Sequence, residues 1–103
     1  MTSGVADTKV IEWDLVVVPH ARVASRVVAG QALILDPRND ALQRLNEVGS
    51  FVWSKIAERS HTFEAIANLM AEEFESDAET IRADLRIFAE ELLTRDCITY
   101  ATP

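Results

Sequence analysis

Three features of the sequence predict an α+β fold in which a small antiparallel sheet precedes three helices. Short β-rich segments separated by turn residues occupy roughly the first half of the chain. After Leu45 the apolar residues recur at helical spacing instead. The chain has 103 residues, of which 49% are apolar and 26% are charged, as expected for one globular domain.

The first half of the chain contains alternating strand and turn segments. The segments with strand character are residues 10–18, 21–28, 32–36 and 41–45. Pro19 ends the first of them or confines it to a sheet edge. Gly30 offers one turn, and "DPRND" at residues 36–40 offers a second, because Pro, Asn and Asp favour turn conformations. The result is a hairpin or short meander.

Three helices and a short terminal strand are predicted for the second half. Asn46 is placed as the N-cap of the first helix, and the second begins near Thr62. Ser76 and Glu79 form a capping-box pattern at the start of the longest helix. The predicted apolar stripes are Val48, Val52 and Ile56; Phe63, Ile66, Leu69, Met70 and Phe74; and Ile81, Leu85, Phe88 and Leu92. With a strand at 97–100, this order is that of a winged helix-turn-helix.

The charge distribution argues against DNA binding, although the predicted fold resembles DNA-binding ones. The net charge is −7, and residues 61–103 carry ten acids and three Arg, whereas residues 1–60 are neutral overall. A groove-reading helix with net negative charge would be repelled by phosphate. We therefore expect no nucleic-acid partner. A winged-helix DNA-binding protein or regulatory adaptor remains the alternative.

The sequence shows no catalytic, metal-binding or cofactor-binding pattern. It has no phosphate-binding glycine loop and no pair of His or Cys at metal spacing. Cys97 lies among apolar residues and is predicted to be a buried structural thiol, and His20 and His61 are predicted to lie at the surface. The carboxylate pairs at 72–73 and 90–91 point apart on a helix. We expect no enzyme activity, no catalytic residues, no metal and no cofactor.

The chain is expected to be cytoplasmic. Its N-terminus lacks the basic and apolar regions of a signal peptide, and its apolar runs are too short to span a membrane. Its single cysteine excludes an internal disulfide and suits a reducing compartment. An interaction module remains, in which an exposed edge strand can pair with a peptide.

Residues 22–100 resemble the pyrroloquinoline quinone biosynthesis protein D (PqqD) family. The resemblance is carried by Leu45-Asn46 after a hairpin, by Gly49 and Trp53, by the Thr62-Phe63 helix start, and by the spacing of the long helix. The last of these comprises Asp84-Leu85, Phe88 and Leu92, followed by Ile98. The chain departs from the family pattern in its "ERSH" loop at 58–61 and in its longer N-terminus.

The resemblance implies a recognition element for ribosomally made, post-translationally modified peptides. Such a domain is a non-catalytic peptide chaperone that holds the leader of a precursor peptide as an added strand. It presents this leader to a modifying enzyme such as a radical S-adenosylmethionine (SAM) protein. The implied division is residues 1–20 as an N-terminal arm or extra strand and residues 21–103 as the peptide-binding domain. Both a monomer and a homodimer are left open.

The resemblance places the peptide between the family's third strand, here about residues 41–45, and its third helix, here about residues 81–93. On the strand, the expected contacts are made by the residues from Ala41 to Leu45. On the helix, they are expected on the flank away from the core stripe, where Arg82 and Arg86 would pair with acidic leader residues or with Glu79 and Glu90 of their own helix. The predicted peptide-binding residues are Ala41, Leu42, Gln43, Arg44, Leu45, Arg82, Arg86, Ala89 and Leu93.

Overall fold

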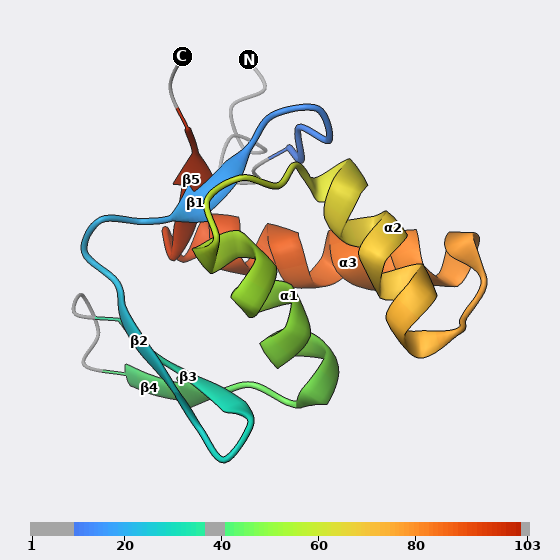
Figure 1. The fold of residues 1–103 in the computed structure, drawn as a ribbon. Coiled ribbons are helices and arrows are strands. Elements are labelled where there is room, and N and C mark those ends of the chain that lie inside the picture. The colour runs from blue at the N-terminus through green and yellow to red at the C-terminus, as the bar shows by residue number, and fades with distance from the viewer. Residues whose placement is uncertain (1–9, 37–40, 102–103) are drawn as a thin grey trace, which may run out of the picture.

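The computed structural model describes residues 10–36 and 41–101, which form two antiparallel sheets and three helices (Figure 1). The larger sheet has the order β2-β3-β4, with β2 at Ala24–Val28, β3 at Gln31–Asp36 and β4 at Ala41–Arg44. The helices follow as α1 (Glu47–Ala57), α2 (Phe63–Phe74) and α3 (Ala78–Thr94). The predicted α+β class, with a three-stranded antiparallel sheet followed by three helices, is confirmed. The predicted turn at 36–40 falls mainly outside the described residues.

The hairpin between β2 and β3 has a two-residue loop, Ala29-Gly30. Both residues have positive φ angles, 53° and 82°. Such turns match the right-handed twist of the paired strands, and they favour glycine because it has no Cβ to clash. The turn predicted at Gly30 is confirmed.

The N-terminal segment differs from its prediction as a strand over residues 10–18. Only Val17–Pro19 forms a strand, β1, and it pairs with β5 (Ile98–Tyr100) in a separate two-stranded sheet. Pro19 is the last residue of β1, consistent with its missing N–H donor. Ile11 and Val17 are both buried, so this segment contributes to the core. Residues 1–9 lie outside the described part of the chain.

Side-chain caps start all three helices. The Asn46 Oδ1 accepts the Gly49 N–H at 2.8 Å, as predicted. The second helix begins where it was predicted, and the Thr62 Oγ1 caps it by accepting the Ala65 N–H at 3.0 Å. The prediction of Ser76 as the third cap is wrong, because Asp77 accepts the Thr80 N–H at 3.2 Å. This hydrogen bond stabilises the carboxylate and is the main cause that lowers the Asp77 pKa.

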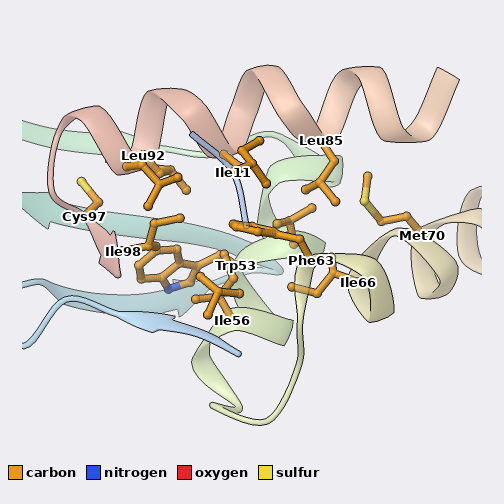
Figure 2. Packing of buried hydrophobic residues seen from close by; sticks show 14 of the residues in the cluster. Ile11, Trp53, Ile56, Phe63, Ile66, Met70, Leu85, Leu92, Cys97 and Ile98 are labelled. Atoms are coloured by element: carbon orange, nitrogen blue, oxygen red, sulfur yellow. The ribbon is translucent and has the colours of Figure 1, made fainter. Parts of the chain in front are cut away.

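One hydrophobic core lies beneath α3 (Figure 2). It combines side chains from the three helices, β1, β3, β5 and the N-terminal segment, among them Ile11, Trp53, Ile56, Phe63, Ile66, Leu85, Leu92 and Ile98. Trp53 is 2% exposed, and its Nε1–H donates to the Ser25 Oγ at 3.0 Å, which ties α1 to β2. Cys97 is buried, as predicted.

Four residues assigned to the apolar stripes, Val48, Leu69, Phe74 and Phe88, are not fully buried, and two of them lie at a groove. Val48 of α1 is 39% exposed, and Phe88 of α3 is half-buried. Both face the space between the first turns of α1 and the middle of α3. The apolar spacing was therefore right for most of each stripe, but these two side chains line a groove.

Candidate functional site

β4 is one of the two outer strands of the larger sheet, and its outer edge pairs with no described strand. The register pairs Leu33 with Arg44 and Leu35 with Leu42. One residue beyond the strand, the Leu45 N–H donates to the Ala32 oxygen at 2.9 Å. Because the groups of an antiparallel pair alternate in direction, Gln43 and Leu45 direct their backbone groups toward β3.

The same alternation directs the backbone groups of Leu42 and Arg44 away from β3. Their N–H and C=O groups are the donors and acceptors that an added strand would use. The side chain of Leu42 is 65% exposed and that of Arg44 is exposed, whereas Leu45 is buried. The predicted strand residues therefore lie together at one edge. The side-chain environment of Ala41 lies outside the described residues.

A serine of α1 completes the pairing at the end of β4. The Ser50 Oγ accepts the Ala32 N–H at 2.8 Å and donates to the Leu45 oxygen at 3.2 Å. Its hydroxyl therefore replaces the direct bond that would close this end of the ladder. Ser50 is buried, so the first turn of α1 is attached to the strand pair through a bond shielded from water.

The β4 edge lies next to the C-terminal part of α3. The Arg95 Nη1 donates to the Gln43 Oε1 at 3.2 Å, and its Nη2 lies 3.3 Å from the Glu91 Oε2. A groove of about 360 Å³ lies between α1 and α3, and Glu91 is one of the residues that line it. Its lining residues are Asn46, Val48, Gly49, Val52, Met70, Asp84, Leu85, Ile87, Phe88 and Glu91.

Gly49 allows α1 and α3 to approach closely beside this groove. A Cβ at this position would lie 3.3 Å from the Phe88 Cε1, 3.3 Å from the Leu45 Cβ and 3.2 Å from the Asn46 Oδ1. The glycine in the motif around Trp53 therefore has a packing role. It keeps the Phe88 ring at the groove and leaves room for the Asn46 cap.

The predicted helix residues do not face the groove. Ala89 and Leu93 are 0% and 6% exposed, so the prediction that they lie on a flank outside the core is wrong. Arg82 forms an ion pair with Glu64 of α2 at 2.7 Å, instead of pairing with Glu79 of its own helix. Arg82 and Arg86 lie about 160–200° around α3 from Asp84, on the opposite side of the helix from the groove.

Trp13 of the N-terminal segment covers this opposite side. The Arg82 and Arg86 guanidinium carbons lie 4.3 and 5.6 Å from the centre of its ring. Trp13 also packs edge-to-face on Phe63, with 6.3 Å between the ring centres. The indole thus contacts both α2 and α3, and both arginines lie against it on the side of α3 opposite the groove.

We predict that Trp13→Ala lowers the free energy of unfolding by about 2–3 kcal/mol, because it removes an aromatic pair and two cation–π contacts. Urea denaturation followed by circular dichroism measures the loss. Trp13→Phe is the matched control and should retain most of the stability. An unchanged unfolding midpoint for Trp13→Ala would mean that the segment does not support α3.

Sequence reasoning missed the groove side of α3. The residues there are Asp84, Ile87, Phe88 and Glu91. Ile87 is 67% exposed, the highest value among the large apolar residues of the described helices. The sequence did contain a signal for this side. Ile87 lies off the core stripe, between Asp84 and Glu91 on the same side of the helix.

Within the described residues, no group of three or more His, Cys, Asp or Glu could hold a metal ion. The His61 ring nitrogen lies 2.6 Å from the Glu58 carboxylate, a contact that lowers the Glu58 pKa. Burial raises the pKa of Tyr100, whose hydroxyl accepts the Glu12 N–H at 2.8 Å.

None of the helices in the described ranges is both long and apolar enough to span a bilayer.

The fold and this edge define the class of a small α+β domain with an open strand beside a helix groove. A sequence model of the family described as "Coenzyme PQQ synthesis protein D (PqqD)" matches residues 31–98. The chain belongs to the PqqD family. Comparison with curated proteins finds no match.

A solved structure shares the fold. It is described as TbiB1 in complex with the TbiA(beta) leader peptide. The TM-score is 0.74, the sequences are 23% identical, and the match covers 84% of this chain and 99% of that chain. At this identity the likeness supports the arrangement of the sheet and helices described above.

Proposed function

We propose that the protein is a non-catalytic peptide chaperone. It captures the leader of a ribosomally made precursor peptide by strand addition and presents it to a modifying enzyme. The observation that carries the proposal is the uncovered β4 edge beside the groove between α1 and α3. Membership of the PqqD family and the shared fold of a structure that contains a leader peptide support the same function.

The proposed capture uses two kinds of contact. The backbone groups of Leu42 and Arg44 pair with the peptide backbone and supply affinity that depends little on sequence. Side chains of the peptide then contact the groove, which supplies selectivity. The protein itself changes no covalent bond in this scheme, so the chemistry belongs to the enzyme that receives the peptide.

A radical SAM enzyme is the finer proposal for the partner. The gene's neighbourhood provides the test, because a precursor gene and a modifying enzyme encoded beside it can be co-expressed with this chain. Co-purification of the enzyme only when the precursor is present would support presentation of the bound peptide. Co-purification with an enzyme of another class would overturn the finer proposal and leave peptide capture intact.

Amide hydrogen exchange tests strand addition at the level of single residues. In the free protein we expect fast exchange at Leu42 and Arg44 and slower exchange at Gln43, whose N–H faces β3. A synthetic leader should slow exchange at Leu42 and Arg44. Binding without this protection would reject the site. Tight, salt-sensitive binding of duplex DNA would instead support the winged-helix DNA-binding alternative.

A further inference from the structure

The groove between α1 and α3 has an apolar interior with a carboxylate toward each end. Met70 and Leu85 are buried at its floor, and Ile87 is exposed at its rim. The charged residues of the lining are Asp84 and Glu91, and it includes no Lys or Arg. An occupant with an apolar side chain and positive charges would therefore be complementary to it.

The spacing of the carboxylates restricts the occupant further. Asp84 and Glu91 are seven residues apart, about 10 Å along the helix, with Ile87 and Phe88 between them. In an extended peptide alternate side chains share a face, and residues four apart are separated by about 13 Å. The long side chains of Lys and Arg can span the difference of about 3 Å.

The groove lies close to the end of β4. Asn46, which follows Arg44 by two residues, already lines the groove, and Glu91 connects it to Gln43 through Arg95. A peptide that pairs with β4 and continues past this end would pass over the groove. The paired segment and the groove segment would thus belong to one extended chain.

We infer that the groove selects a peptide segment in which an apolar residue has Lys or Arg two positions before and two positions after it. This inference rests on the proposed function. The apolar side chain enters between Val48 and Phe88, and the basic side chains reach Asp84 and Glu91. The inferred preference is for basic peptide residues, whereas the sequence analysis, with Arg82 and Arg86 in the site, expected acidic ones.

The two carboxylates are not equivalent. Arg95 already neutralises part of the charge of Glu91, at a distance of 3.3 Å. Asp84 lies two helical turns away and is exposed. We therefore expect Asp84 to contribute more of the preference for a basic residue than Glu91 does.

The experiment selects binders from a display library of short random peptides with the full chain as bait. Binders are retained when their capture is lost with Arg44→Pro, a change at the strand edge. The retained sequences are then compared at the positions two before and two after the apolar residue. We expect Lys and Arg to be enriched at both of these positions, and the affinity to fall as salt is raised.

Two double variants separate the groove from general electrostatics. Asp84→Asn with Glu91→Gln should weaken the selected peptides about tenfold, the combined effect of two partly exposed ion pairs. Glu72→Gln with Glu73→Gln changes the net charge equally on an exposed part of α2 and should leave affinity unchanged. Edge-dependent binders without a basic preference would overturn this inference alone. A library that yields no edge-dependent binder would overturn the proposed function as well.

Discussion

Replacement of Arg44 by proline is expected to weaken peptide capture about tenfold to a hundredfold while the protein stays folded. The Arg44 N–H faces away from β3, so its removal costs no bond within the sheet. A peptide carbonyl that would have accepted this N–H is left unpaired, at about 1–3 kcal/mol, and the proline ring adds a steric obstacle. Isothermal titration with a synthetic leader measures the loss.

The strand itself tolerates this proline. Proline is compatible with a strand edge where the N–H faces outward, and it restricts the preceding residue to the extended conformation that Gln43 already has within β4. Arg44→Ala is the matched control, since it removes the charge and keeps the N–H. It should bind nearly as well as the unmodified chain.

A proline at the neighbouring position, Gln43, should destabilise the fold, whereas a proline at Arg44 should not. Gln43→Pro removes an N–H that pairs with β3, so it should lower the free energy of unfolding by about 1–3 kcal/mol and perturb the whole edge. Equal binding by Arg44→Pro and Arg44→Ala would contradict strand addition at β4. Equal destabilisation by the two proline variants would contradict the alternation assigned to this strand.

Local chemistry made much of the fold predictable. Asn46 and Thr62 cap helices because a short polar side chain precedes an apolar periodic run in each case. At the third helix two adjacent residues could cap, and the sequence pattern favoured Ser76. Asp77 is the cap because its carboxylate binds both the backbone N–H and the hydroxyl of Thr80, at 3.2 and 2.8 Å.

The side of α3 that lines the groove was not predictable from the helix alone. A stripe at i, i+4, i+7 and i+11 identifies one buried line, but it does not say how far burial extends to either side. Here Ile11 and Trp13, about 70–80 positions earlier in the chain, lie against α3 and extend the core toward Ala89 and Leu93. The open side is consequently that of Ile87. Such a long-range contact leaves no trace in the local spacing.

Replacement of Ser50 by alanine is expected to destabilise the protein, because it removes a buried hydroxyl that joins α1 to the strand pair. It leaves the buried Ala32 N–H without its partner, whereas the Leu45 oxygen still accepts from the Gln31 Nε2 at 3.5 Å. The unsatisfied N–H costs about 1–3 kcal/mol, and the higher helix propensity of alanine returns about 0.5 kcal/mol. A net loss of about 1–2 kcal/mol is a substantial part of the stability of a domain this size.

Thermal denaturation measures the effect, with a decrease in Tm on the order of 5–15 °C. Ser54→Ala is the matched control on the same helix, because the Ser54 hydroxyl donates only within α1, to the Phe51 oxygen at 2.7 Å. That variant should change stability by about 0.5 kcal/mol or less. Equal Tm values for the two variants would show that the Ser50 bonds do not hold the strand pair.

The peptide affinity of the folded Ser50→Ala variant then distinguishes an effect on stability from an effect on the geometry of the site. Leu45 ends the strand segment and Asn46 lines the groove, so the Ser50 hydroxyl fixes the position of β4 relative to α1, which forms one wall of the groove. If this position matters, affinity should fall at temperatures where the variant is still fully folded. Ser54→Ala should retain its affinity. An unchanged affinity in folded Ser50→Ala would mean that the edge and the groove bind independently, because a peptide held by both requires a constant separation between them.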